Sequence, residues 1–534
     1  MAYPSPYPSV EIPDVSVPEY LFGDLSPATA GGNAAAAEHP ALIDGTSGQT
    51  ISYGQLAQMV DRVAAALAER GIGKGDVVGI FVPNVPLWPA VFHGVLASGA
   101  TATTVNSLLT ADEVAKQLKD AGAKLLFTVS PFLDRADPAA TAAGIDPATG
   151  VIPLDGAEGR GDLKQLLACQ GPTPRPTVSP AEDLAVLPYS SGTTGQGKGV
   201  MLTHRNLVAN LAQCEDPLRP DTTERVLAVL PFFHIYGMQV VLNLFLRHRK
   251  TVVTLPKFEL PTFLQAIQDH RTDTVFIAPP VALALAKHPL VDQFDLSAMR
   301  YILSGAAPLD EELAAAVSRR LNVRMRQGYG MTETSPVTHA IPMDDRGESI
   351  SVGTVGPPLP DTECRVVDPA TGEAASRGEL WMRGPQVMKG YLNNPQATAD
   401  TIDSDGWIHT GDVVEVDDAG LFTVVDRVKE LIKYKGYQVP PAELEALLLT
   451  HPKIADAAVI GIRDPDGEEV PKAYVVVHDE ASDLVPDEVI EFVAARVAPY
   501  KKVRVVEFID AIPKAATGKI LRKELRAREA TMPS

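Results

Sequence analysis

The residues best suited to chemistry lie in the stretch 189–204, where small polar side chains and glycines follow a short apolar run. Within nine positions stand Ser190, Ser191, Gly192, Thr193, Thr194 and Lys198. Glycine lets the backbone approach a ligand closely, and consecutive N–H groups flanked by hydroxyls form a concavity suited to phosphate oxygens. Lysine adds a mobile positive charge, a common partner of phosphate. The stretch therefore predicts a site for a nucleotide triphosphate.

Two other interpretations of this stretch are open. Gly192, Gly197 and Lys198 match the first part of the P-loop motif of nucleoside triphosphatases. That motif needs Ser or Thr next, and a helix whose N-terminus faces the phosphate. Here Gly199 follows and the next helix signal begins at Thr203, so a P-loop fits poorly. The stretch could also be a Ser-, Thr- and Gly-rich surface turn without a ligand.

Four later stretches carry polar and aromatic residues that suit a nucleotide and a flat substrate. They are 230–237 around His234, 305–308 with 327–333, 378–384 with 405–412, and 426–438. Glu333 could ligate magnesium, which takes one or two protein carboxylates beside substrate phosphates and waters. Tyr329 could stack on a flat ring, and Asp412 could accept ribose hydroxyls. Each stretch alone could be an ordinary loop, and a lone histidine is more often structural.

Composition and charge restrict the class of protein. The chain has 534 residues, of which 45% are apolar and 21% charged, as in a globular protein. Its formal net charge of −20 argues against a surface for nucleic acid. Three cysteines at unrelated spacings suit a reducing compartment and indicate neither disulfides nor a zinc site. Because no signal peptide, membrane span or peroxisomal address is apparent, a cytoplasmic location is expected; the oligomeric state is unknown.

Alternating helix and strand signals predict an α/β fold. Capping boxes at Ser52 and Thr110 begin two helices, and apolar runs at 77–82 and 124–129 predict buried strands. This alternation continues to about residue 340 and therefore predicts parallel sheets covered by helices. The stretch 134–182, rich in Pro, Ala and Gly, is the internal candidate for disorder.

In their order and spacing, these stretches resemble the adenylate-forming superfamily of acyl- and aryl-CoA synthetases, beetle luciferases and peptide-synthetase adenylation domains. The resemblance covers about residues 20–528 and is most specific at 190–204, 327–333, 407–412, 426–445 and 513–519. The stretches 233–236, 255–258 and 433–438 look most like 4-coumarate–CoA ligases. The resemblance implies that a carboxylate attacks the α-phosphate of ATP, which gives acyl-AMP and pyrophosphate. Coenzyme A then displaces AMP to form a thioester.

The resemblance also implies two domains. Residues 1–428 are expected to form a large domain of helix-covered, largely parallel sheets with a β-barrel-like part. Residues 429–534, called the lid below, are expected to form a small, mobile α+β domain. In relatives the lid rotates between the half-reactions, and their hinge matches Lys429 here, where many have Asp.

The residues carried over from the superfamily group by ligand. The phosphates are assigned to the residues from Ser190 to Thr194 and to Lys198, and magnesium to Glu333. The remaining nucleotide contacts are Ala307, Gln327, Gly328 and Thr332, with Asp412 and Arg427 at the ribose. Lys519 is expected to bridge the carboxylate and the α-phosphate, and Lys433 and Gln438 match residues implicated in adenylation. Coenzyme A is assigned to Lys257, Lys435 and Gly436.

The carboxylic acid is the least determined ligand. By resemblance, the acyl site is walled by His234, Tyr236, Gly237, Gln239, Leu303, Gly305, Gly328, Pro336 and Val337. Plant coumarate ligases tend to have Lys in place of Leu303 and Asn in place of Gln239. Phe233 stands where amino-acid-activating domains have Asp, which argues against a peptide-synthetase role. A hydroxycinnamic or other aryl acid and a medium-chain fatty acid therefore stay open as substrates. A luciferase-like oxygenase and a non-catalytic ATP- or CoA-binding relative stay open as alternatives to a ligase.

Overall fold

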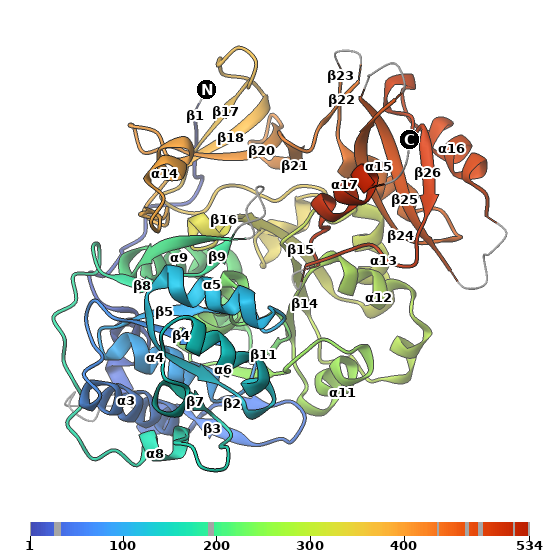
Figure 1. Ribbon diagram of the computed structural model, residues 1–534. Helices are drawn as coiled ribbons and strands as arrows, with labels where there is room; N and C mark the ends of the chain where they lie inside the picture. The colour runs from blue at the N-terminus through green and yellow to red at the C-terminus, as the bar shows by residue number, and fades with distance from the viewer. Residues whose placement is uncertain are drawn as a thin grey trace.

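The computed structural model describes residues 2–25, 34–190, 197–434, 437–464, 469–478, 484–515 and 518–531. Within these ranges the chain forms a large body built on three sheets, and the lid lies at one corner of that body (Figure 1). The predicted α/β fold class is confirmed. The predicted domain boundary lies in the turn between β21 (Phe422–Arg427) and β22 (Ile432–Tyr434), and it stays a prediction.

The first eight-stranded sheet contains the two strands that flank the predicted phosphate loop. Its strands run in the order β19, β10, β8, β5, β4, β6, β7, with β9 paired to β10. Their bounds are β4 (Val77–Ile80), β5 (Thr101–Thr104), β6 (Ala123–Thr128), β7 (Val151–Pro153), β8 (Leu184–Val186), β9 (Tyr189–Ser190), β10 (Lys198–Thr203) and β19 (Gly390–Tyr391). Strands β4 to β8 pair in parallel, whereas β10 is antiparallel to its neighbours. The prediction of parallel strands is therefore correct for the centre of this sheet.

The second eight-stranded sheet is parallel from β2 through β15. Its order is β16, β15, β14, β13, β11, β12, β2, β3. The bounds are β2 (Pro40–Asp44), β3 (Thr50–Ser52), β11 (Arg225–Ala228), β12 (Thr251–Thr254), β13 (Thr274–Ile277), β14 (Tyr301–Ser304), β15 (Arg324–Gly330) and β16 (Val337–Ala340). Because ligand sites in such sheets form beyond the carboxyl ends of the strands, the stretches after β14 and β15 are well placed to meet a ligand.

Helices cover these sheets, and they begin at the caps and bury the apolar faces that the sequence predicts. Both predicted capping boxes form, at Ser52 before α3 and at Thr110 before α5. The larger helices of the body are α3 (Tyr53–Glu69), α4 (Trp88–Ala97), α5 (Ala111–Ala121), α9 (His204–Leu218), the π-helix η4 (Tyr236–Asn243), α11 (Leu260–His270), α12 (Pro279–Lys287) and α13 (Glu311–Leu321). The shorter ones are α1 (Val17–Phe22), α2 (Ala34–Glu38), α10 (Leu244–Arg247) and α14 (Pro395–Thr401). No helix in the described ranges has an apolar run long enough to cross a bilayer.

The expectation of disorder across 134–182 is wrong. This stretch contains most of α6 (Leu133–Ala142), α7 (Pro147–Gly150), β7 and α8 (Leu163–Leu167). Small residues such as Ala136, Ala139 and Ala140 are buried, so they pack closely instead of loosening the chain. Composition alone overestimated disorder because it ignores this packing.

The main hydrophobic core joins the two large sheets. It contains Val78 and Val186 from the first sheet, Val226 and Phe276 from the second, and residues of α4, α9 and η4 between them. A separate core lies between the opposite face of the second sheet and the helices α11, α12 and α13. Since side chains of both sheets share one core, the loops at their carboxyl ends are held in fixed relation to each other.

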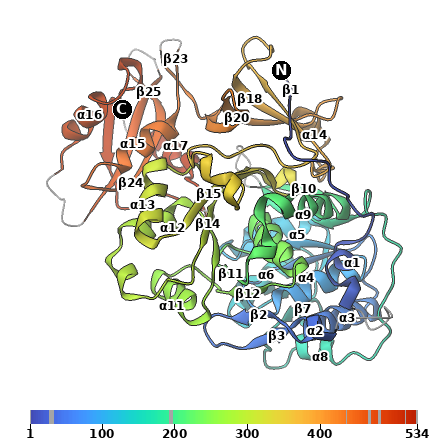
Figure 2. The same cartoon turned by 180° about the vertical axis from the view of Figure 1, so that it is seen from behind.

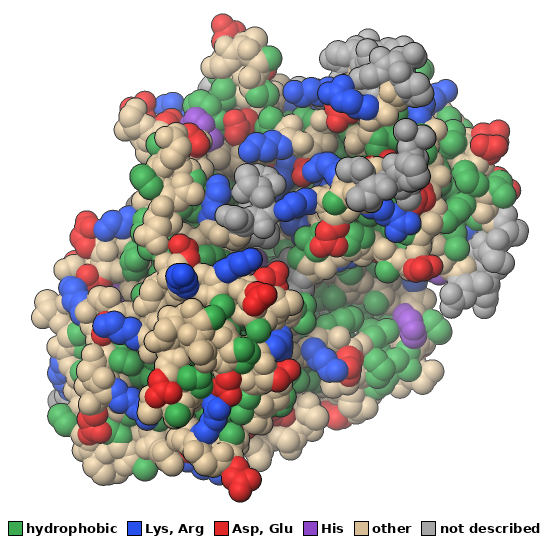
Figure 3. Space-filling view, in the orientation of Figure 1, with side chains coloured by type: hydrophobic (Ala, Val, Ile, Leu, Met, Phe, Trp, Pro, Cys, Tyr) green, Lys and Arg blue, Asp and Glu red, His purple; other side chains and the backbone are tan. Residues whose placement is uncertain are grey.

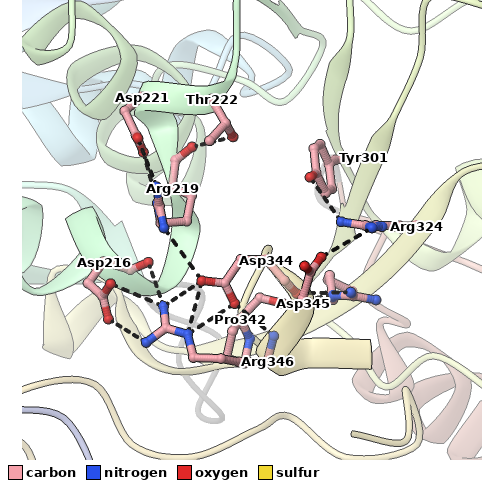
Figure 4. Close-up of polar contacts among 11 residues, drawn as sticks. Asp216, Arg219, Asp221, Thr222, Tyr301, Arg324, Pro342, Asp344, Asp345 and Arg346 are labelled. Atoms are coloured by element: carbon pink, nitrogen blue, oxygen red, sulfur yellow. Dashed lines mark hydrogen bonds and ion pairs between the residues drawn. The ribbon is translucent and has the colours of Figure 1, made fainter. Parts of the chain in front are cut away.

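A cluster of ion pairs ties the end of α9 to the chain after β16 (Figure 4). The Arg346 guanidinium contacts both carboxylate oxygens of Asp216, at 2.9 and 3.1 Å, and also bonds Asp344. Arg219 approaches Asp344 at 3.6 Å. These carboxylates raise the pKa of Arg346 above its usual value. Exposed ion pairs contribute little individually to the free energy of folding. The cluster as a whole holds the segment that follows β16 against the end of α9.

A third sheet and the lid complete the molecule. The third sheet is antiparallel and contains β1 (Ala2–Pro4), β17 (Glu363–Val367), β18 (Arg377–Arg383), β20 (Ile408–Val416) and β21; it occupies the place of the predicted barrel-like part. The lid contains β22, β23 (Tyr437–Val439), α15 (Pro441–Leu449), β24 (Ile454–Arg463), β25 (Glu469–Val477), α16 (Pro486–Ala494), β26 (Val505–Phe508) and α17 (Arg522–Thr531). Both views place the lid beside α12 and α13 (Figures 1 and 2).

Candidate functional site

The two strands that flank the predicted phosphate loop pair with each other. Ser190 at the end of β9 lies opposite Lys198 at the start of β10. Ser191, Gly192, Thr193 and Thr194 lie outside the described residues. Because Lys198 begins a strand that continues to Thr203, the P-loop interpretation is wrong: that motif requires a helix at this point.

Lys198 and the predicted magnesium ligand lie on two sides of one tyrosine. The Lys198 ammonium is 4.6 Å from the centre of the Tyr391 ring, and the Tyr391 hydroxyl donates a 2.8 Å hydrogen bond to Glu333 Oε1. Glu333 is buried in the short helix η6 (Thr332–Thr334), which also contains the predicted nucleotide contact Thr332. The structure thus brings Lys198, predicted to bind phosphate, and Glu333, predicted to bind magnesium, together through Tyr391, a contact that sequence reasoning missed.

The predicted ribose residues form a hydrogen-bonded group. Asp412 in β20 pairs directly with Arg427 in β21, and Arg427 Nε lies 3.1 Å from Asp412 Oδ1. The Tyr329 hydroxyl donates a 2.6 Å bond to Asp412 Oδ2, and burial raises the pKa of this tyrosine well above its usual value. Tyr329, which the sequence suggested as a stacking residue, therefore also orients the carboxylate predicted to bind ribose.

Lys519 of the lid lies close to the side chains predicted to bind ribose and to the predicted acyl site. Burial, followed by the nearby Arg427 cation, lowers the pKa of Lys519 to about 8, while Asp412 opposes the shift. A Cβ added at the neighbouring Gly518 would lie 3.1 Å from Pro280 Cγ at the start of α12, so this lid segment packs directly on the large body. Residues far apart in the sequence therefore meet here.

His234 faces the same region from the large body. Burial, together with the positive charge of Lys519, lowers the pKa of His234 to about 4, so the ring is neutral at pH 7. The Tyr236 N–H donates to His234 Nδ1 at 3.3 Å, which leaves the ring proton on Nε2. A neutral imidazole with one N–H is suited to hydrogen-bond an anionic or carbonyl oxygen.

The predicted wall of the acyl site is only partly defined by contacts. The Tyr236 hydroxyl donates to the Leu303 carbonyl oxygen at 3.4 Å, and a Cβ at Gly305 would lie 3.1 Å from the Tyr236 ring. A Cβ at Gly328 would lie 3.8 Å from Leu303 Cδ2. Because Leu303 is 4% exposed and uncharged, this part of the wall is apolar.

Other predicted wall residues have packing roles of their own. Gly237 lies so close to the chain before η4 that a Cβ there would be 2.2 Å from the Pro231 carbonyl oxygen. The Gln239 amide donates to the Leu207 carbonyl oxygen at 2.9 Å and accepts from Asn243. Pro336 and Val337 are buried beside the start of β16. Their contact with a substrate stays a prediction.

The loop after β14 is held by Gln327. Its Oε1 accepts from the Leu309 N–H at 2.7 Å, and its Nε2 donates to the Val352 carbonyl oxygen at 2.6 Å. Ala307 lies in this loop and is half-buried. Gln327 therefore positions the loop. Its described side-chain hydrogen bonds go to the protein backbone, so its contact with a nucleotide stays a prediction.

The remaining predicted residues of the lid and of the coenzyme A site are dispersed. Lys429 is exposed in the turn after β21, and Lys433 is exposed in β22, where its N–H donates to Glu469 at 2.8 Å. Lys257 is exposed and pairs with Glu259 at 2.6 Å. Lys435, Gly436 and the side chain of Gln438 lie outside the described residues.

Buried charges at the base of the lid escaped the sequence prediction. Asp426 accepts a 3.0 Å bond from the Ala442 N–H at the start of α15, although it belongs to the third sheet. Arg522 and Glu445 form an ion pair at 2.6 Å, and burial raises the pKa of Glu445. Asp426, Ala442 and Glu445 all lie within the predicted motif 426–445, whereas Arg522 comes from the far end of the lid.

Positive side chains gather where the lid meets β20 and β21 (Figure 3). Arg427 ends β21, and Lys429 is exposed in the turn that follows it. The chain as a whole carries a formal charge of −20, so this local excess of cations is not a general property of the surface. Such a patch attracts anionic ligands such as phosphates.

Comparisons with known proteins find similar proteins over nearly the whole chain. Residues 32–392 match the model of AMP-binding enzymes, and residues 443–519 match the AMP-binding enzyme C-terminal domain. The chain is 40% identical to 4-coumarate–CoA ligase 3 of Oryza sativa subsp. japonica, with 99% of this chain and 95% of that protein covered. It is also 40% identical to 4-coumarate–CoA ligase 1 of Petroselinum crispum, with 98% and 96% covered.

Two solved structures share the fold. ATP-bound MatB from Rhodopseudomonas palustris is 28% identical with a TM-score of 0.85, and 97% of this chain and 99% of that chain are covered. The anthranilate CoA ligase AuaEII, in complex with anthranoyl-AMP, is 26% identical with a TM-score of 0.85 and 98% of each chain covered. From the matches to both domains and the full-length relatives, we conclude that the chain belongs to the AMP-binding enzyme family, as its motifs predict.

Proposed function

We propose that this AMP-forming acid–CoA ligase acts on an aryl-propenoic acid of the 4-coumarate or cinnamate kind. The acid attacks the α-phosphate of ATP, forming acyl-AMP and releasing pyrophosphate. The thiol of coenzyme A then attacks the acyl carbon, forming the acyl-CoA thioester and releasing AMP. The curated relatives with 40% identity over nearly the full chain carry the name 4-coumarate–CoA ligase.

The observation that carries this proposal is the position of Lys519 beside Arg427, Asp412 and His234. A carboxylate and a triphosphate repel each other, so cations must neutralise both before they can react. An ammonium group next to the ribose pair and the acyl wall is well placed to contact both anions. Burial and the Arg427 cation lower the pKa of this lysine, and the negative charge of ATP would raise it.

Magnesium fits the residues around Glu333. In the described part of the chain no three acidic, histidine or cysteine side chains converge on one point. A metal ion held here would bind Glu333 and take its other ligands from phosphates and water, which is usual for Mg²⁺. When bound, the ion would neutralise phosphate charge. Lys198 would contribute a second cation from the adjacent strand.

A medium-chain fatty acid is the second candidate substrate. Leu303 is buried and apolar at the position where plant coumarate ligases tend to have Lys, so this wall offers no cation to a phenolic hydroxyl. An unsubstituted cinnamate or an aliphatic chain suits such a wall better than a hydroxylated ring does. Pockets discriminate a methylene or hydroxyl by about tenfold or more, so the two classes are separable by rate.

The lid boundary and its motion are part of the same proposal. We place the lid at residues 429–534, with the exposed turn at Lys429 as the hinge for the second half-reaction. In the present orientation Lys519 faces the nucleotide residues, which suits the first half-reaction. A cytoplasmic location, suggested by the scattered cysteines, stays a prediction.

The test is a two-stage assay on the purified chain. Pyrophosphate release is measured with ATP, Mg²⁺ and cinnamic, benzoic or C4–C12 fatty acids, first without and then with coenzyme A. We expect release that depends on the acid, and thioester formation that is fastest with cinnamic-type acids. Fastest turnover with C6–C12 acids would establish the second candidate. Light emission with luciferin and oxygen would instead indicate a luciferase-like oxygenase, and absence of pyrophosphate release with every acid would refute the ligase.

A further inference from the structure

Tyr391 connects three elements of the large body through its backbone and its side chain. It ends β19, where it pairs with Val200 of β10, and its N–H donates to Thr398 Oγ1 of α14 at 2.9 Å. Its side chain is buried and reaches Glu333 in η6. These anchors hold the ring in one position independently of any ligand.

The Tyr391 hydroxyl holds one half of the Glu333 carboxylate. It donates to Oε1 at 2.8 Å, and no other described side chain hydrogen-bonds this group. Within the described ranges, Oε2 therefore has no hydrogen-bond partner. A carboxylate fixed by one oxygen keeps the other available for a metal ion in a defined orientation, which is how partners outside the metal's own ligands commonly tune affinity.

The Tyr391 ring also contacts Lys198. The ammonium lies 4.6 Å from the ring centre, within range of a cation–π interaction. Lys198 and Glu333 carry opposite charges, yet the two described side chains contact Tyr391 from different directions instead of forming an ion pair. If they paired with each other, the lysine would be lost to the phosphates and the carboxylate to the metal.

We propose that Tyr391 is a positioning residue that prepares the metal–nucleotide site: its hydroxyl orients Glu333 toward a divalent cation, and its ring keeps Lys198 apart from Glu333 for the phosphates. This inference rests on the proposed ATP-dependent function. It separates two contributions of one side chain, which two substitutions can remove one after the other.

The experiment compares Tyr391→Phe with Tyr391→Leu in the full chain. Mn²⁺ binding is measured by electron paramagnetic resonance of the free ion in the presence of α,β-methylene-ATP, which binds but is not cleaved between its α- and β-phosphates. Tyr391→Phe keeps the ring and should weaken Mn²⁺ binding by about 10- to 100-fold. It should leave the affinity for the metal-free analogue almost unchanged. Tyr391→Leu should in addition weaken the metal-free analogue by about 2- to 5-fold.

A matched control removes a buried tyrosine hydroxyl elsewhere. Tyr53 donates to the Lys250 carbonyl oxygen at 2.6 Å in the large core, so Tyr53→Phe loses a comparable hydrogen bond without touching Glu333. It should leave Mn²⁺ binding unchanged. If Tyr391→Phe binds Mn²⁺ as tightly as the unmodified chain, or if Tyr53→Phe weakens it equally, Tyr391 has only a structural role and the proposal is wrong.

A second measurement keeps the proposal testable if the Tyr391 variants lose stability. In a Glu333→Gln background, Tyr391→Phe should cause no further loss of Mn²⁺ affinity, because the hydroxyl acts through that carboxylate. Losses that simply add would overturn the proposal. The binding assay contains no acid and no coenzyme A, so its failure is distinguishable from failure of the acid-dependent pyrophosphate assay.

Discussion

The low pKa of Lys519 makes the first half-reaction sensitive to pH. Burial and the Arg427 cation lower this pKa from 10.5 to about 8, which corresponds to about 3 kcal/mol against the charged form in the ligand-free site. The direction of the pH dependence follows from the proposed role of Lys519. Its ammonium form can neutralise the carboxylate and the α-phosphate, whereas its neutral amine form cannot. Below pH 8 the lysine is charged and active, and above pH 8 an increasing fraction is neutral in the free enzyme.

The assay is acid-dependent pyrophosphate release without coenzyme A, because the thiol of coenzyme A titrates in the same range as Lys519. Since kcat/KM reports the groups of the free enzyme, it should fall by about tenfold per pH unit above pH 8. Substitution Lys519→Ala should slow this step by about 10²- to 10³-fold. The same variant should still form thioester from supplied acyl-adenylate, since that step does not need the bridge.

The substitution Lys519→Arg is the matched control for charge. Arginine stays protonated over the whole range, so its residual activity should show no loss between pH 8 and pH 10. If the alkaline loss persists in Lys519→Arg, another group titrates and the assignment of the pKa is wrong. Normal pyrophosphate release by Lys519→Ala would refute the catalytic role itself.

Three further predictions concern the base of the lid. Lys429→Pro should restrict the proposed hinge and slow thioester formation while adenylation continues; equal loss in both half-reactions would contradict a hinge. Arg522→Met leaves the buried Glu445 carboxylate without its partner and should lower the free energy of unfolding, measured in urea, by about 3–5 kcal/mol. The double variant Arg522→Met with Glu445→Leu should recover most of this loss of stability. Lys287 donates to the Leu449 carbonyl oxygen at the C-terminus of α15, so Lys287→Met should weaken docking of the lid and slow adenylation by about 2- to 5-fold, with thioester formation from supplied acyl-adenylate as the unaffected control.

Local signals in the sequence predicted local structure well. The capping boxes at Ser52 and Thr110 form as expected, because the bonds that close them span three residues and need no distant partner. The stretch 134–182 was mispredicted, because its alanines are ordered by packing against other elements and not by their own preferences. Composition alone cannot report such neighbours.

The candidate site shows the same division. The types and spacing of Lys198, Glu333 and Asp412 indicate phosphate, metal and ribose chemistry from the sequence, since charge and hydrogen-bonding capacity are properties of each residue. Their neighbours were not predictable: Tyr391 has no motif that marks it as the partner of Glu333. The hydrogen bonds of the Gln239 amide to the Leu207 carbonyl oxygen and to Asn243 were likewise not predictable, and its contact with a substrate stays a prediction.

The sequence by itself determined which chemical groups are available, their order along the chain, and the short-range bonds that begin helices. Only the tertiary structure decided that Lys519 is buried and lies near Arg427, and hence that the pKa of this lysine is low. The physical reason is that burial and Coulomb interactions depend on distance in space, whereas chain order constrains distance only over a few residues. Packing of the lid on the large body therefore creates the electrostatic environment in which the proposed reaction takes place.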